Sequence, residues 1–284
     1  MALKNRWVIY FTERFPLPVN IIVSAGLAIT SQALAGTPNQ PAWIAAFWGS
    51  FLFSATLRFM DETKDYEKDK VAHPKRPLPR GLFTVAEFSR AIWLSLGLMV
   101  LTALACALWI STLTGVFYLG VTLYLYLMYK EFFVGESLNR APLLYAISHQ
   151  IVILGLAFFV MEAYGPEHRM LGFTLGIFYL GTFFTYEVCR KLDPKAHPVL
   201  KTYLSIYGRA GSAAIAIVTG VLSLWAAREL GLLFWIAPLI GLTWTSLVLM
   251  WADPTKHKWI EGMATLSLLM HLWAVPLARW VEGA

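Results

Sequence analysis

Apolar residues occur along this chain in blocks of about 20, and the short segments between the blocks hold most of the charged residues. An α-helix of that length crosses the hydrocarbon core of a bilayer, which is about 30 Å thick. The pattern therefore predicts an all-α membrane bundle of about nine transmembrane helices. The predicted spans are residues 17–36, 42–60, 88–110, 112–129, 141–163, 170–189, 209–227, 231–250 and 258–281.

The composition supports a membrane protein. Of the 284 residues, 58% are hydrophobic and only 14% are charged, against about 25% charged in an average soluble domain. No internal repeat, low-complexity tract or linker divides the chain, so we expect one integral-membrane domain over residues 1–284. The N-terminal stretch MALKNRWVIYFTERFPLP carries charges where a signal peptide would be apolar, so we expect the first span to be retained.

The placement of basic residues predicts the orientation. Of the 23 Lys and Arg residues, only Arg169, Arg228 and Arg279 lie on one side of the predicted bundle. The positive-inside rule then places the N-terminus and the charged loops in the cytoplasm. This asymmetry also accounts for the isoelectric point near 9.3, so the basic character gives no support for nucleic-acid binding.

A strongly acidic segment, DETKDYEKD, follows the second predicted span. If the helix continues through it, Asp61, Asp65 and Asp69 lie four residues apart on one face, with Glu62 beside Asp65. Like charges at this spacing cost about 0.2–0.5 kcal/mol per pair even on an exposed helix. The segment therefore predicts a compensating cation.

Two sources of positive charge are compatible with this pattern. The first is a solvated helix end with salt bridges to lysines of the same segment, Lys64, Lys68 and Lys70. The second is Mg²⁺, which binds a few carboxylates together with phosphate oxygens of a substrate. The basic run that follows would supply further phosphate partners, Lys75, Arg76 and Arg80. Carboxylates, metal and basic side chains together indicate a diphosphate site.

At this point the sequence resembles the UbiA superfamily of intramembrane prenyltransferases, which have nine helices and a first motif Asn-Asp-x-x-Asp-x-x-x-Asp. Asp61 stands in the Asn place and Glu62 in the first Asp place, whereas Asp65 and Asp69 are unchanged. RPLPRG, residues 76–81, is similar to the basic segment that follows this motif. A Tyr-x-x-x-Lys pattern at the end of the fourth helix is met by Tyr126 and Lys130.

The second family motif, Asp-x-x-x-Asp extended by a further Asp and a Thr, is altered in this chain. EVCRKLDPKAHPVLKT puts Glu187, Lys191, Lys195 and Thr202 in those places, with Asp193 nearby. The resemblance implies two metal ions, so this departure predicts that one is lost or weakly bound. Its charge would be replaced by Arg190, Lys191 or Lys195.

These observations lead to a hypothesis of a Mg²⁺-dependent prenyltransferase that moves a prenyl group from a prenyl diphosphate to an acceptor not identified by the sequence. The resemblance implies metal ligands Glu62, Asp65, Asp69 and Glu187, with Asp61 assisting. The predicted diphosphate-binding residues are Lys75, Arg76, Arg80, Lys130, Arg190, Lys191 and Lys195. Residues predicted to line the acceptor site or cavity are Tyr126, His149, Asp193 and Tyr203.

His149, in the fifth predicted span, has two interpretations: binding or deprotonating the acceptor, or a neutral histidine satisfied by a neighbouring helix. Three rival functions use similar residues. A terpene cyclase of the same fold needs no acceptor. A cation transporter would place its ionisable groups near the bilayer midplane, whereas here they crowd at the predicted helix ends. A CDP-alcohol phosphotransferase would have Asp-Gly and Ala-Arg elements that this segment lacks.

Overall fold

The computed structural model describes residues 3–282, and in that range nine helical segments are long and apolar enough to cross a membrane. This confirms the predicted all-α bundle and the number of spans. The spans are α2 (Leu17–Ala35), α3 (Gln40–Lys64), α5 (Val85–Trp109), α6 (Thr112–Tyr129), α8 with α9 (Pro142–Gln150 and Val152–Glu162), α10 (Arg169–Arg190), α11 (Tyr203–Glu229), α12 (Leu233–Ala252) and α13 (His257–Glu282).

Shorter helices connect these spans. The α-helical ones are α1 (Leu3–Glu13), α4 (Tyr66–Ala72) and α7 (Gly135–Arg140). The 3₁₀ turns are η1 (Glu131–Phe133), η2 (Pro166–His168), η3 (Pro198–Leu200) and η4 (Pro254–Lys256).

Polar residues at the ends of the spans explain where several helices begin. The Asn39 side chain accepts a hydrogen bond from the Ala42 amide at the start of α3, and Thr84 forms a capping box with Glu87 at the start of α5. Such side chains satisfy amide groups that have no partner within the helix. These spans thus begin at polar residues, which are suited to the surface of a bilayer.

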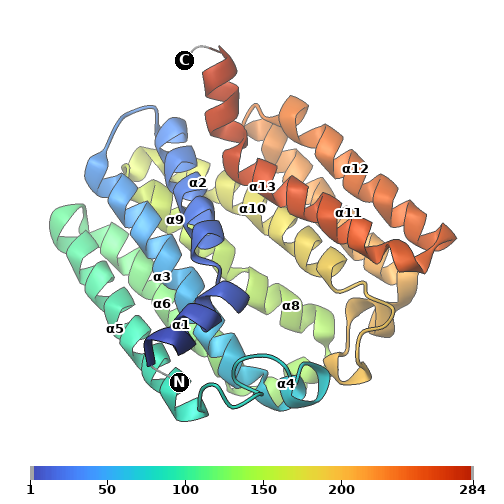
Figure 1. The fold of residues 1–284 in the computed structure, drawn as a ribbon. Helices are drawn as coiled ribbons and strands as arrows, with labels where there is room; N and C mark the ends of the chain where they lie inside the picture. The colour runs from blue at the N-terminus through green and yellow to red at the C-terminus, as the bar shows by residue number, and fades with distance from the viewer. Residues whose placement is uncertain (1–2, 283–284) are drawn as a thin grey trace.

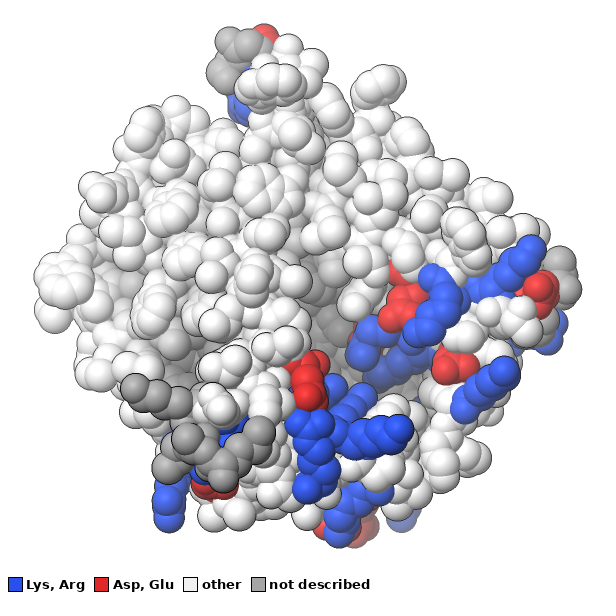
Figure 2. Space-filling model, viewed as in Figure 1, with Lys and Arg blue, Asp and Glu red and all other residues white. Residues whose placement is uncertain are grey.

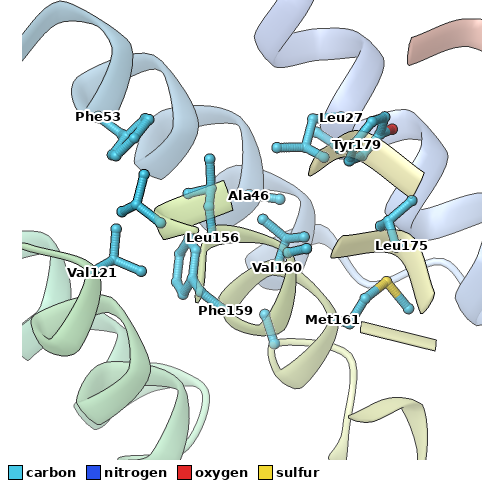
Figure 3. Close-up of a cluster of buried hydrophobic side chains, with 14 of the residues drawn as sticks. Leu27, Ala46, Phe53, Val121, Leu156, Phe159, Val160, Met161, Leu175 and Tyr179 are labelled. Carbon is cyan, nitrogen blue, oxygen red and sulfur yellow. The ribbon is translucent and has the colours of Figure 1, made fainter. Parts of the chain in front are cut away.

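The core is made by apolar side chains from most of the spans. Leu27 of α2, Phe53 of α3, Val121 of α6, Leu156 of α9 and Leu175 of α10 contribute to one buried cluster (Figure 3). Close packing without a hydrophobic driving force between helices depends on small residues. At Gly181, where α10 crosses α11, a Cβ atom would lie only 2.6 Å from the Thr219 carbonyl oxygen.

The two termini lie at opposite ends of the bundle (Figure 1), as an odd number of spans requires. Most of the Lys, Arg, Asp and Glu side chains visible in the same view gather at the end that carries α4 and the connection from α10 to α11 (Figure 2). The apolar surface elsewhere on this face is the expected lipid contact. The segregation of charge therefore agrees with the sequence, and the cytoplasmic assignment of this end stays a prediction.

The N-terminal helix α1 was not assigned in the sequence analysis. It lies across α3 at the charged end of the bundle (Figure 1). Trp7 packs on Phe83 with ring centroids 4.7 Å apart, and Tyr10 packs on Phe88 at 5.1 Å. Arg6 pairs with Glu87 at 3.0 Å. Helix α1 is therefore held against the start of α5 and the loop before it by aromatic packing and an ion pair.

The topology can be tested with single cysteines. In Lys68→Cys and Lys195→Cys, we expect an impermeant thiol reagent to label from one face of the membrane, because both positions lie at the charged end. Glu167→Cys should label only from the other face. The native Cys106 and Cys189 are buried, so background labelling should be low. Labelling of positions 68 and 195 from opposite faces would contradict the fold.

Candidate active site

The acidic segment continues the second span as predicted, with one break. Helix α3 ends at Lys64 and α4 begins at Tyr66, while Asp65 between them has φ −90° and ψ 3°. The Asp65 amide still donates to the Asp61 carbonyl at 3.0 Å, and the Asp69 amide donates to the Asp65 carbonyl at 2.8 Å. Helical hydrogen bonds therefore continue across Asp65, although this residue separates the two helices.

Asp61 faces the interior of the charged end, whereas the Asp65 side chain, one turn further along, is half exposed. Asp61 lines a small pocket between α3, α6 and α8, together with Lys64, Tyr129 and His149. The carboxylates of Asp65 and Glu187 are close enough to repel that of Asp61 electrostatically. Carboxylates more than a hundred positions apart in the sequence therefore influence one another electrostatically at this end of the bundle.

Glu62 points the other way, which corrects its predicted place among the metal ligands. Its side chain is buried, and its Oε1 accepts hydrogen bonds from Arg58 and, at 2.8 Å, from Nε of Arg14. Burial, and then the Glu62 charge, raise the pKa of Tyr10 on α1 above its ordinary value. Adjacent residues on a helix differ in direction by about 100°, so Asp61 and Glu62 cannot both face the pocket.

Asp69 is also unavailable as a metal ligand, contrary to the prediction. The carboxylate is buried, and Nη1 of Arg76 lies 2.6 and 2.7 Å from its two oxygens. Arg80 binds Glu13 of α1 at 3.0 Å and the Lys75 carbonyl oxygen at 2.9 Å. The basic loop after the acidic segment is therefore used mainly to hold α4 and α1 in place. In this structure Arg76 and Arg80 do not act as free phosphate partners, contrary to the sequence interpretation.

Lys64 is a site residue that the sequence analysis treated only as a possible charge partner. Its Nζ lies 3.0 Å from Nε2 of His149 and 3.6 Å from Glu131, and it sits 4.9 Å above the ring of Tyr145. His149 Nδ1 lies 2.8 Å from the Tyr145 carbonyl oxygen, which can only accept. Nδ1 therefore donates to this carbonyl, and Nε2 accepts from the lysine.

The turn after α6 places Glu131 beside this lysine. Glu131, Phe132 and Phe133 all have left-handed φ values of 50–59°, a conformation that costs an L-residue about 1–2 kcal/mol. Strained residues persist where their surroundings hold them. Here Glu131 is held by the Lys64 ion pair and by the Tyr145 hydroxyl, which donates to it at 3.2 Å.

The altered second motif lies at the end of α10. Both oxygens of Glu187 are paired, one with Arg190 at 2.6 Å and one with Lys191 at 2.5 Å. The Lys191 ammonium is 5.8 Å from the ring centroid of Tyr203 at the start of α11. Glu187 therefore binds two cations and does not stand free for a metal, and Tyr203 lies beside Lys191 and does not line the pocket of Asp61.

Other predicted residues lie at the edge of the site or outside it. Asp193 faces His257 at 3.6 Å and accepts a hydrogen bond from the Lys195 amide at 2.8 Å. The following turn η3 packs against α4, so both charged loops meet. Tyr126 lies against the largely exposed Trp93 of α5, with centroids 6.0 Å apart, and does not line the pocket.

Lys130 caps the same end of α6, with its ammonium 5.0 Å from the ring of Tyr129. Tyr129, which lines the pocket, was missed because the family pattern drew attention to Tyr126. The sequence could have identified Lys64 as a site residue, because a lysine within a run of carboxylates on one helix is placed to neutralise them.

Comparison of the sequence with known protein families identifies one family. The profile of the UbiA prenyltransferase family matches residues 20–275. The chain belongs to the UbiA prenyltransferase family. It is thus an integral, multi-pass membrane protein of a prenyltransferase family, as the resemblance in its first motif implied.

A solved structure of digeranylgeranylglyceryl phosphate synthase has a similar fold. The TM-score is 0.66 at 17% sequence identity, and the match covers 96% of this chain and 98% of the other. No curated protein matches the sequence. The UbiA fold is therefore shared along nearly the whole chain, whereas a likeness at 17% identity carries no information about the substrates.

The UbiA resemblance implies bound metal, and the side chains fit it only in part. Between residues 3 and 282, no group of three or more His, Cys, Asp or Glu side chains is arranged to hold an ion. Glu62 and Asp69 are committed to arginines. Asp61 and Asp65, one turn apart, suit Mg²⁺, which is often bound by one or two carboxylates and completed by substrate phosphates.

Proposed function

We propose that this UbiA-family protein is a Mg²⁺-dependent prenyltransferase that moves a prenyl group from a prenyl diphosphate to an acceptor. The diphosphate would lie at the charged end of the bundle, between the acidic segment of α3 and the end of α10. The prenyl tail would lie among the apolar helices. The positive-inside rule places this end in the cytoplasm.

The observation that carries this proposal is the meeting of two charged groups from distant parts of the chain. Asp61 and Asp65 come from the first motif, and Glu187 with its two cations comes from the second. The charged side chains in Figure 2 gather mostly at the end of the bundle that carries α4 and the connection from α10 to α11, where α4 packs against η3. A prenyl diphosphate matches this arrangement, because its anionic head suits the charged end of the bundle and its hydrocarbon tail suits the apolar helices.

Each charged side chain has a role in this proposal. Asp61 and Asp65 would hold one Mg²⁺, which when bound stabilises negative charge on the leaving diphosphate. Lys64, Arg190 and Lys191 would bind phosphate oxygens by charge-assisted hydrogen bonds. The surrounding apolar side chains exclude water, so that the allylic cation is captured by the acceptor and not hydrolysed.

His149 would act on the acceptor side of the pocket. Its Nε2 lone pair points at Lys64, inside the pocket that Asp61 also lines. An acceptor hydroxyl that displaced the lysine could donate its proton to this nitrogen. The alternative of a purely structural histidine applies better to His271, which is fully buried between Ser223 and the Ser267 carbonyl.

The proposal is tested with the purified protein in nanodiscs and prenyl diphosphates of several chain lengths. We expect diphosphate release that requires Mg²⁺ and an added lipid-soluble acceptor, with the prenylated acceptor identified by mass spectrometry. A cyclic hydrocarbon or alcohol from donor alone would instead establish a terpene cyclase. Metal-dependent ion flux without turnover of any donor would support the transporter and overturn the proposal.

A further inference from the structure

The second acidic motif of this chain is occupied by its own cations. Arg190 and Lys191 take one oxygen each of Glu187, at 2.6 and 2.5 Å. Lysine also stands at position 195, and the nearby Asp193 is turned toward His257. No carboxylate of this segment is left with both oxygens unpaired and directed at the site, so its donor set does not suit a second Mg²⁺.

We infer that Arg190 and Lys191 bind the diphosphate directly, in place of a second metal ion, and that Glu187 is the positioning residue that orients them. This inference rests on the proposed function. It assigns a one-metal site to the chain, with the ion on the side of Asp61 and Asp65 and two fixed basic side chains on the side of α10.

The geometry of the three side chains supports this assignment. They lie within one turn at the end of α10, where cations are also favoured by the helix dipole. The Arg190 and Lys191 side chains are both 44% exposed, against 19% for Glu187. The cations can therefore reach a ligand, while the carboxylate behind them holds their direction.

The charge balance at the site also favours one metal. Asp61, Asp65, Glu131 and Glu187 contribute four negative charges. Lys64, Lys68, Arg190 and Lys191 contribute four positive charges. A site made of carboxylates alone would need two divalent ions before it attracted a diphosphate. Here the side chains already cancel, so one Mg²⁺ suffices to make the site positive.

Binding of inorganic pyrophosphate to the full chain tests the inference separately from turnover. The protein in nanodiscs would be titrated with pyrophosphate by calorimetry, with Mn²⁺ replacing Mg²⁺ so that bound metal can be counted by electron paramagnetic resonance. We expect one metal ion per bound pyrophosphate. Two ions per pyrophosphate would overturn the inference and leave the proposed function standing, whereas no binding under any metal condition would overturn both.

Substitutions of the basic residues give a second readout. Lys191→Gln and Arg190→Gln should each weaken pyrophosphate binding by about tenfold or more, the value of a lost charge-assisted hydrogen bond. The metal count should stay at one. Lys191→Arg should retain binding. The matched control is Lys258→Gln, because Lys258 also pairs with a glutamate of its own helix, at 2.9 Å, and should leave binding unchanged.

The Lys191→Asp variant tests whether Lys191 binds phosphate or only forms a surface ion pair with Glu187. It restores a carboxylate where the family has one, so a site that still preferred two metals would recover binding at high Mg²⁺. We expect weaker pyrophosphate binding than in Lys191→Gln at every Mg²⁺ concentration, with an unfolding midpoint that shows the protein is folded. Recovery of affinity with a second bound ion, or unchanged affinity in Lys191→Gln, would overturn the inference.

Discussion

Replacing Asp61 or Asp65 by alanine is expected to reduce prenyl transfer by about a hundredfold or more, the effect of removing one group that stabilises charge in the transition state. Each variant would lose one of the two carboxylates proposed to hold Mg²⁺. EDTA should have a similar effect on the unchanged protein. Turnover of donor and acceptor, followed by mass spectrometry at several Mg²⁺ concentrations, measures the effect.

The matched control is Glu67→Ala. Glu67 belongs to the same acidic segment, but its side chain is 76% exposed and pairs only with Lys70, at 2.7 Å. We expect nearly unchanged turnover in this variant. Full activity of Asp61→Ala or Asp65→Ala would remove these residues from the site, and equal loss in Glu67→Ala would show that the segment acts only through its net charge.

Replacing Glu62 by alanine is expected to destabilise the protein by about 3–5 kcal/mol, the cost of breaking a buried ion pair. The substitution would leave Arg14 and Arg58 without their shared carboxylate under α1. The unfolding midpoint of the purified protein in detergent measures the effect. Asp65→Ala should change stability by about 0.5 kcal/mol or less, because Asp65 is half exposed and only weakly paired, with Lys68 at 3.9 Å.

Glu62 and Asp65 are therefore expected to give opposite results. Loss of Asp65 should impair turnover in a stable protein, whereas loss of Glu62 should impair folding first. Glu62→Gln keeps the shape and one hydrogen-bond acceptor, so its loss of stability should be smaller than that of Glu62→Ala. A stable Glu62→Ala protein that had lost Mg²⁺-dependent turnover would return Glu62 to the metal site.

The first motif shows how far a residue pattern could be interpreted before the structure was known. The spacing of Asp61, Asp65 and Asp69 correctly predicted a helical segment, since four residues make about one turn. It did not predict which carboxylates face the pocket. That depends on Arg14, in the turn between α1 and the first span, and on Arg76, in the loop after α4, and neither contact leaves a periodic signal.

The two motifs also illustrate what the resemblance could transfer. The match of RPLPRG to the family was specific, yet in this chain Arg76 and Arg80 bind carboxylates of the protein. At the second motif, the departure from the family was visible in the sequence as two lysines. Only the structure shows that Lys191 is paired with Glu187.

The sequence by itself determined the membrane location, the nine spans and the gathering of charge at one end, because bilayer thickness and the cost of buried charge act on residues wherever they later pack. Tertiary structure alone decided the site. The Arg14–Glu62 ion pair, the contact of Lys64 with His149, and the electrostatic interaction of Asp61 with Glu187 all join residues from different segments of the chain. Such contacts depend on how the helices pack and on where each one breaks, and hydrophobic periodicity along a single helix carries no information about either.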